Sequence, residues 1–421
     1  MSVQNAINGG FLSLDAFYRG RVSMPYMRGE GKHLFNKRPD LFDEKLIGTG
    51  ASSFVAADAL VSLTTAANND AAIRQTFQAY AYQAGKSQLG IYTFDRGDPE
   101  ANIVKRCGSF RSSSTTTPWA PTDGLWLESS SSVWSFNIGK AGVLETAVQA
   151  SWNLDKLDGT GPSKVTLDKT KAQIMFVDFE WLGVGTVAFG FFIDRVPIYC
   201  HYFHHANRLN LPWVATPNLP IRYEIRQTGA GSGTFKQICS SIISEGGADP
   251  TGIVCVHDTN MATFASSGVT VASNMTVPLL GLRLQAGRRG VEVVPLECGV
   301  MAGSAANLRF TLLLNPTLTA SGGSSVYAFT YGDKSGSNLQ VATLVPTGTQ
   351  GSSVITEANM GTPLDSDFAS QSSRISVSSL ETGRRLGIAI DGTQDTLVLA
   401  VTNLSNANAA FIGRIKWREI F

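Results

Sequence analysis

Two carboxylates stand two residues apart in the most strongly patterned apolar stretch of the chain. Asp178 and Glu180 alternate with Phe179 and Trp181 in AQIMFVDFEWLG, residues 172–183. In an extended strand, residues i and i+2 share a face, so both acids are expected on one side. Glycoside hydrolysis uses a carboxylate pair, which makes them candidate catalytic residues of a polysaccharide depolymerase. A solvated or cross-strand-paired face explains the same residues, and we prefer that interpretation.

A second cluster, CHYFHH, occupies residues 200–205. On a strand, His201 and His205 fall on one face, whereas Cys200 and His204 fall on the other. Zinc needs three or four converging nitrogen or sulfur ligands, so His201 and His205 are weak metal candidates. Histidines hydrogen-bonded among aromatic residues at a strand end are the preferred interpretation, and a pH-sensitive contact is a third.

The acidic turn NLDKLDGTG carries Asp155 and Asp158, and Asp168 follows it. Carboxylates in a glycine-rich loop can bind calcium, although the order of ligands typical of an EF-hand is absent. Asp-Gly is also a strong turn signal on its own. We therefore retain Asp155 and Asp158 as candidate metal ligands and expect no bound metal.

If the protein binds glycans, tryptophan rings are the side chains expected to contact the sugars. Trp126, Trp134 and Trp213 are candidate glycan-stacking residues if their rings are exposed, and core residues if they are buried. The chain has no phosphate-binding glycine loop, nucleophile elbow or HExxH motif. We therefore expect neither an enzyme nor a cofactor.

The composition limits the classes of partner. Charged residues make up 16% of the 421 residues, below the roughly 25% of typical domains, which suggests that neighbouring subunits cover much of the surface. Lys+Arg 34 against Asp+Glu 33 argues against direct nucleic-acid binding. Neither a signal peptide nor an apolar stretch of membrane-spanning length is present, so we expect synthesis in a cytoplasm and no membrane insertion. Five widely spaced cysteines indicate free thiols.

Side chains alternate between apolar and polar in many short segments after residue 86, and turn signals separate them. The pattern predicts strands over 173–181, 187–193, 221–226 and 411–421, with a hairpin over 386–401. Residues 71–84 are ambiguous, and we favour a strand. The predicted fold class is all-β. We expect an extended arm over 1–45, a jelly-roll-like β-sandwich over 46–285 and a smaller β-sandwich or barrel over 286–421.

Three sequence words carry a resemblance to a known family. WNLDKLDGTG, DFEWLGVG and LPIRYEI, all within residues 86–250, stand in an order that resembles uncharacterised virion proteins of tailed phages and environmental viruses. The order of GSF, DGLWLE and a returning strand is similar, more loosely, to concanavalin-like jelly-roll sandwiches. The resemblance implies a particle component, located in the virion and made in the host cytoplasm.

The resulting hypothesis is a structural protein of a phage tail, fibre or head surface. It would act through contacts with other virion proteins in a homo-oligomer, for which a trimer is the first expectation. The alternative is a glycan-binding or receptor-binding module that contacts a host surface glycan. A polysaccharide depolymerase is the minor alternative.

Overall fold

The computed structural model describes most of the chain. The described residues are 20, 24–97, 100–246, 251–259, 268–302, 306–318, 327–328, 331–343, 345–346, 355–370, 375–378 and 385–421. Over these ranges the regular structure is antiparallel β-sheet, apart from the 3₁₀ turn η1 (Gln149–Ser151). The predicted all-β fold class is confirmed. The same ranges hold no helix with the length and apolar character of a membrane span.

The chain divides into two compact units, Met1–Pro250 and Thr251–Phe421, which we call the N-terminal and C-terminal units. The sequence had placed this boundary at 285. It lies earlier because three strands between 251 and 285 pair with strands near the end of the chain. The glycine-rich stretch near 285–305, which suggested the boundary, lies within a unit.

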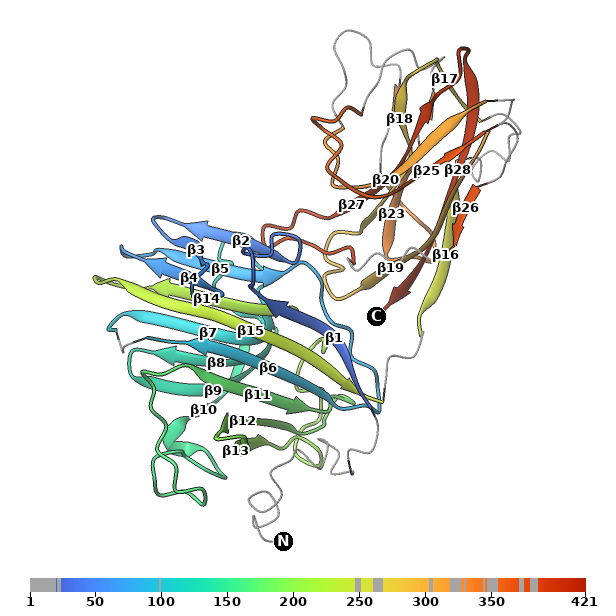
Figure 1. Cartoon of the computed structure of the whole chain (residues 1–421). Helices are drawn as coiled ribbons and strands as arrows, with labels where there is room; N and C mark the ends of the chain where they lie inside the picture. The colour runs from blue at the N-terminus through green and yellow to red at the C-terminus, as the bar shows by residue number, and fades with distance from the viewer. Residues whose placement is uncertain are drawn as a thin grey trace. The chain divides into compact units, whose positions relative to one another are not determined.

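The N-terminal unit is a sandwich of two antiparallel sheets (Figure 1). The eight-stranded sheet has the order β13-β12-β11-β6-β15-β4-β3, with β1 also paired to β15. Its strands are β1 (Pro25–Lys32), β3 (Ala51–Val55), β4 (Leu60–Thr65), β6 (Gln88–Asp95), β11 (Gln173–Phe179), β12 (Val187–Ile193), β13 (Val196–Phe203) and β15 (Gly233–Glu245). The seven-stranded sheet has the order β10-β9-β8-β7-β14-β5-β2. Its strands are β2 (Phe42–Ile47), β5 (Ala71–Thr76), β7 (Ile103–Arg111), β8 (Asp123–Ser130), β9 (Val133–Lys140), β10 (Val143–Val148) and β14 (Ile221–Gln227).

Part of the predicted N-terminal arm belongs to the sandwich. Strand β1 pairs with β15 from Pro25↔Glu245 to Lys32↔Cys239, and β2 pairs with β5. The segment PYMRGEGK lacks an alternating apolar pattern because β1 exposes most of its side chains to solvent. The remainder of the predicted arm, before residue 24, lies outside the described residues except for Gly20. The strand favoured for 71–84 is present as β5 over its first half.

Aromatic rings fill the space between the two sheets of the N-terminal unit. Phe136 of β9 lies between Trp152 and Phe189, with ring centroids 4.3 Å and 4.6 Å away. All three rings are buried. Burial of each such side chain contributes about 1.5–3 kcal/mol. The alternation of residues 134, 136 and 138 toward the core is therefore what holds β9 in this sheet.

The C-terminal unit is a second, smaller sandwich. A five-stranded sheet has the order β16-β28-β19-β26, with β17 also on β28, and a six-stranded sheet has the order β22-β23-β18-β27-β20-β25. The strands of the first are β16 (Ile253–Asp258), β17 (Val269–Val271), β19 (Glu292–Ala302), β26 (Ile375–Ser378) and β28 (Ala409–Ile420). The strands of the second are β18 (Thr276–Leu284), β20 (Leu308–Leu314), β22 (Gly332–Asp333), β23 (Leu339–Thr343), β25 (Thr362–Ala369) and β27 (Thr396–Asn403). Two short strands, β21 (Tyr327–Ala328) and β24 (Val345–Pro346), pair with each other.

The last strand behaves as its pattern predicts. In β28, Phe411, Ile415 and Trp417 are fully buried in the core of the C-terminal unit, and the residues on the opposite face of the strand are partly exposed. Of the predicted hairpin over 386–401, the structure forms only the turn, with the single bridge Ile388↔Gln394. The returning strand β27 pairs with β18 and β20 instead of with residues 386–390. The end of the chain is therefore tied into a sheet.

Candidate functional site

The predicted acid pair lies at the end of β11. Asp178 is buried on the face of the strand opposite the core, and the Tyr199 hydroxyl donates to its Oδ2 at 3.4 Å. Glu180 follows the strand, and its Oε1 accepts the Thr186 backbone N–H at 3.1 Å. Glu180 thus stabilises the turn between β11 and β12. Both carboxylates have a local structural contact, so the geometry gives a depolymerase no specific support.

A row of aromatic rings crosses this outer face of the eight-stranded sheet. It consists of Phe176 on β11, Phe192 on β12, and Tyr199 and Tyr202 on β13, and we call it the aromatic ribbon. Centroid distances are 5.1 Å for Phe176–Phe192, 5.0 Å for Phe176–Tyr199 and 5.7 Å for Tyr199–Tyr202. Phe176 is buried, whereas the other three rings are partly exposed. The ribbon therefore offers solvent an amphipathic surface next to Asp178.

A glycine makes the ribbon possible. Gly190 of β12 pairs with Phe176 on one side and with Tyr199 on the other. A Cβ at this position would lie 2.4 Å from Phe176 Cζ and 2.3 Å from the Ile198 carbonyl oxygen. The absence of a side chain lets the Phe176 ring lie over β12. The positions of the ribbon rings are thus fixed by the sheet beneath them.

The histidines of the cluster have different hydrogen-bond partners. His201 Nδ1 accepts the Asn153 backbone N–H at 3.2 Å, and burial lowers the pKa of His201 to about 4. His205 follows β13, stacks on Trp213, and places Nδ1 2.7 Å from the Gly185 carbonyl oxygen. Its Nε2 lies 3.1 Å from a Glu145 carboxylate oxygen. The two histidines have separate neighbours, in agreement with the structural interpretation of the cluster.

The carboxylates of the acidic turn accept hydrogen bonds from backbone N–H groups of the same turn. Asp155 accepts the backbone N–H groups of Leu157 and Ser163 at 2.8 and 2.7 Å. Asp158 accepts the Thr160 backbone N–H at 2.9 Å, and the hydrogen bonds from Thr160 lower the pKa of Asp158. Such bonds are typical of Asp in tight turns. Among residues whose positions are described, no three His, Cys, Asp or Glu side chains converge as metal ligands.

The three candidate tryptophans are core residues. Trp126 and Trp134 are 0% exposed and Trp213 is 3% exposed, so none presents a ring face to a sugar. Sequence reasoning passed over Trp119, which lies in the loop between β7 and β8 and is partly exposed. The Arg226 guanidinium lies over its ring at 4.9 Å. No periodic pattern surrounds Trp119 because it lies in an irregular loop.

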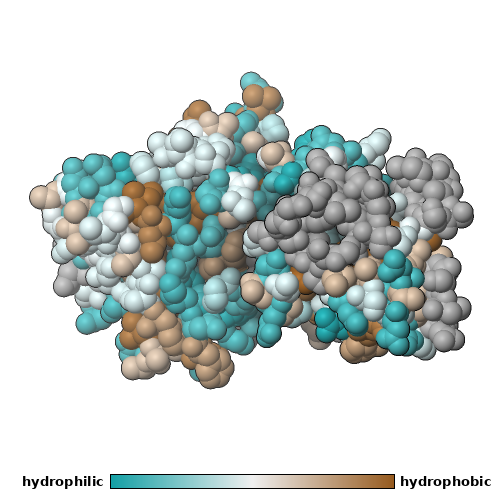
Figure 2. Space-filling model, turned by 90° about the horizontal axis from the view of Figure 1, so that it is seen from above, coloured by the Kyte–Doolittle hydropathy of each residue, from teal (hydrophilic) through white to brown (hydrophobic). Residues whose placement is uncertain are grey.

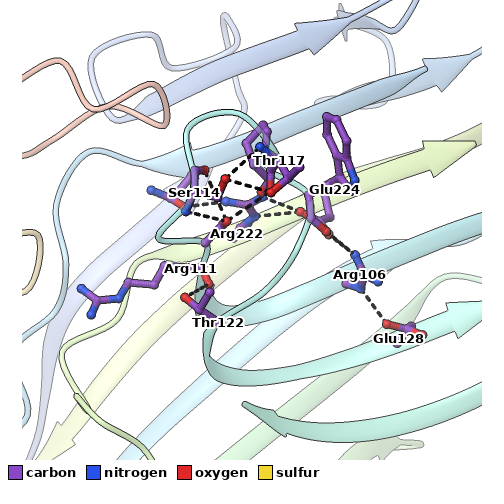
Figure 3. A network of polar contacts seen from close by, with 12 residues as sticks. Arg106, Arg111, Ser114, Thr117, Thr122, Glu128, Arg222 and Glu224 are labelled. Atoms are coloured by element: carbon purple, nitrogen blue, oxygen red, sulfur yellow. Dashed lines mark hydrogen bonds and ion pairs between the residues drawn. The ribbon is translucent and has the colours of Figure 1, made fainter. Parts of the chain in front are cut away.

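A buried ion network anchors this loop to the outer face of the seven-stranded sheet (Figure 3). Arg222 donates to Glu224 through Nε at 2.8 Å and Nη2 at 2.6 Å, and both side chains are 1% exposed. Arg106 donates to the other oxygen of Glu224 at 2.5 Å and to Glu128 at 2.6 Å. Burial opposes charge on Arg106, but the two carboxylates raise its pKa. The network is thus a closed set of paired charges.

The same arginines bind the backbone of the loop. Arg106 donates to the Trp119 carbonyl oxygen at 3.0 Å, and Arg222 donates to the Pro118 carbonyl oxygen. Ser114 and Thr117 hydroxyls close the loop with hydrogen bonds of their own (Figure 3). Two fixed guanidinium groups therefore hold the loop on the sheet. Its role in this structure is to cover the ion network.

No protein-family model matches the chain, and no curated protein sequence does. Among solved structures, a Bacillus licheniformis β-glucanase is 10% identical, with a TM-score of 0.35, over 52% of this chain and 97% of the glucanase. The carbohydrate recognition domain of Emp47p is 12% identical, with a TM-score of 0.34, over 51% and 93%. A legume lectin-like domain from Entamoeba histolytica is 9% identical, with a TM-score of 0.32, over 50% and 95%.

Proposed function

We propose that the N-terminal unit is a glycan-binding module that uses the aromatic ribbon as its contact surface. The observation that carries the proposal is the row of three partly exposed rings, Phe192, Tyr199 and Tyr202, on one face of a rigid sheet. The buried tryptophans Trp126, Trp134 and Trp213 are not part of this surface.

The chemistry of the ribbon suits a sugar ring. The C–H groups on one face of a pyranose are weakly positive and pack on the negative faces of aromatic rings. Tyrosine hydroxyls at the edges of the same rings donate to and accept from sugar hydroxyls. Tyr199 also donates to Asp178, and this bond orients the phenol. A row of rings in van der Waals contact suits consecutive units of a chain better than a single compact ligand.

The rigidity of the site reduces the entropy cost of binding. Phe176, the fully buried ring of the ribbon, packs against Phe192 and Tyr199, and the strands that carry the rings pair from β11 to β13 with one β-bulge beside Gly190. Side chains that are already ordered lose little freedom when a ligand binds. The ribbon therefore needs no rearrangement before contact with a glycan.

The experiment is a glycan array with the whole chain, followed by calorimetry on the best binder. Tyr199→Ala and Tyr202→Ala are each expected to weaken binding about tenfold, which corresponds to about 1.4 kcal/mol per lost ring contact. Tyr26→Ala is the matched control, because Tyr26 is a 47% exposed tyrosine on β1 of the same sheet. Equal losses in all three variants, or no binding by the wild type to any glycan, would contradict the proposal.

The same assay separates binding from cleavage. Array glycans incubated with the wild type are expected to remain intact by mass spectrometry. Asp178→Asn and Glu180→Gln serve as comparisons, because they keep the shape of each side chain and remove its charge. Product release by the wild type that either variant abolishes would favour the depolymerase instead.

A structural role in a virus particle is the second candidate function. It is favoured by large apolar side chains that the described surface leaves exposed, such as Phe35 at 89% and Phe368 at 64%. Figure 2 shows that the apolar groups form small, separate patches among hydrophilic residues on the face in view. Such a surface suits several limited contacts with neighbouring subunits. Labelling of purified virus particles with an antibody against the recombinant chain is the test, and unlabelled particles would remove this candidate.

A further inference from the structure

Strand β10 forms an open edge of the seven-stranded sheet. It pairs with β9 on one side, and no described strand pairs with its other side. Its side chains are unusually exposed for apolar residues, with Val143 at 75%, Leu144 at 49% and Val148 at 40%. Exposed edge strands usually carry lysine, proline or a bulge that prevents pairing with another chain. The sequence VLETAV has no lysine, proline or bulge, and its one charged side chain, Glu145, is hydrogen-bonded to His205.

The hairpin geometry shows which backbone groups point outward. β9 and β10 are joined by Ala141 and Gly142, both with positive φ (48° and 85°), as in a two-residue type I′ turn. In such a hairpin the closing pair, Lys140↔Val143, is hydrogen-bonded, and the bonding alternates along the strands. The N–H and C=O groups of Leu144, Thr146 and Val148 therefore point away from β9. The Val148 carbonyl already accepts the Ser151 hydroxyl at 2.8 Å, which leaves its second lone pair.

The outward N–H and C=O groups of β10 can pair with the same groups of β10 in a second copy of the chain. A two-fold axis perpendicular to the sheet can bring β10 antiparallel to β10 of a second copy with Thr146 opposite Thr146. Leu144 then lies opposite Val148 of the second copy, and the outward groups form three hydrogen-bonded pairs. The same register places Glu145 opposite Ala147, whereas a shift by two residues places Glu145 opposite Glu145. One register therefore pairs the apolar residues and avoids like charges.

We propose that two copies of this chain associate through β10 in this register, so that their seven-stranded sheets become one continuous sheet. The near-zero net charge of the chain, +1, opposes association only weakly. A two-fold edge pairing closes on itself, because it uses the same strand of each copy. The structure thus favours a dimer over the trimer expected from the sequence.

Size measurement by light scattering on the whole chain tests the dimer. The wild type is expected at twice the chain mass of 45.0 kDa at high concentration. Thr146→Pro removes an outward donor without removing a bond to β9, and Leu144→Lys places a charge at the edge; both are expected to give monomers. Circular dichroism checks that each variant folds. Val254→Lys is the matched control, because Val254 is a 47% exposed residue on the edge strand β16 and is expected to leave the dimer intact.

Cross-linking tests the register. Thr146→Cys lies on the two-fold axis and is expected to yield a covalent dimer with a short bis-maleimide. Val143→Cys is expected to yield none, since the two Val143 positions lie about 20 Å apart along the paired strands. The wild type controls for the native cysteines, of which Cys239 and Cys255 are partly exposed.

Three outcomes overturn the proposal. A monomer at every concentration would show that β10 does not pair with a second copy of this chain. A dimer or trimer that persists in both folded β10 variants, or that Val254→Lys dissociates, places the interface elsewhere. Equal cross-linking at positions 143 and 146 contradicts the register.

Discussion

Glu224 is the carboxylate on which the ion network of the N-terminal unit depends. Its two oxygens accept from Arg222 and Arg106, and both Glu224 and Arg222 are 1% exposed. Ion pairs at an exposed surface contribute little, but removal of one partner from a buried pair leaves an uncompensated charge. Glu128, at the outer end of the network, is 22% exposed.

We predict that Glu224→Gln lowers the free energy of unfolding by about 3 kcal/mol, because it leaves buried Arg222 without its counter-charge. Glu128→Gln is expected to cost about 1 kcal/mol or less, because water reaches that end of the network. Urea unfolding monitored by tryptophan fluorescence measures both changes. Equal losses in the two variants would show that burial does not decide the effect.

His33 is a second residue whose environment has a measurable consequence. It follows β1, is 1% exposed and lies 5.6 Å from Phe42, measured between ring centroids. Burial, and then the nearby guanidinium groups of Arg74 and Arg38, lower the pKa of His33 to about 4.

This lowered pKa makes stability depend on pH in a defined window. A histidine in the unfolded chain has a pKa near 6.5. Below about pH 6.5 the unfolded state therefore binds a proton at His33, whereas His33 of the folded state stays neutral until the pH approaches 4. The free energy of unfolding therefore keeps its full value above about pH 6.5 and falls as the pH drops toward 4. The total loss caused by His33 is about 3 kcal/mol. We predict that His33→Phe removes this part of the acid sensitivity. Unfolding free energies measured between about pH 7 and pH 4 test it, with His204→Gln, at a more exposed histidine, as the control.

At the scale of elements, β28 is the strand on which the C-terminal unit depends most. It pairs with β19 along most of its length and with β16 and β17 on its other edge. Near its end, the fully buried Glu419 accepts Trp417 Nε1 at 2.8 Å and the Asn338 backbone N–H at 2.8 Å. Asn338 Nδ2 and the Ser337 hydroxyl donate to the same carboxylate. This one side chain therefore ties β28 to the turn before β23.

We predict that Glu419→Ala lowers the free energy of unfolding of the C-terminal unit by about 3 kcal/mol, because several buried donors lose their acceptor. Glu297→Ala on the neighbouring strand β19 is the comparison; its partner Arg414 is 34% exposed, so the loss is expected to be small. Differential scanning calorimetry follows both. A Glu419→Ala protein as stable as Glu297→Ala would contradict this role.

At the scale of the whole molecule, each unit has its own hydrophobic core and its own sheets. We predict that fragments 1–250 and 251–421 each fold and unfold cooperatively when expressed separately. The fragment 286–421 is expected not to fold, because it lacks β18, which lies between β23 and β27. Circular dichroism with thermal unfolding decides, and a folded 286–421 fragment would restore the boundary expected from the sequence.

The sequence by itself determined the fold class and the central strands. In 173–179 and 187–193, alternate residues pack into the core, and a strand with one core-facing side shows this as a period-2 pattern in its own sequence. The same holds for β28, where every second residue is buried. The sequence also identified the turn formed by Asp155 and Asp158, because Asp–Gly turns depend on near neighbours alone.

The tertiary structure alone decided which residues meet. β1 shows no alternation because it exposes most of its side chains and is held by backbone bonds to β15, more than two hundred residues away in sequence. The aromatic ribbon combines three strands, and its rings converge only because the register sets Gly190 between Phe176 and Tyr199. Burial removed Trp126, Trp134 and Trp213 from the candidate sites. Strand register and the burial of a particular side chain depend on contacts with distant segments, and the pattern within one segment does not specify those contacts.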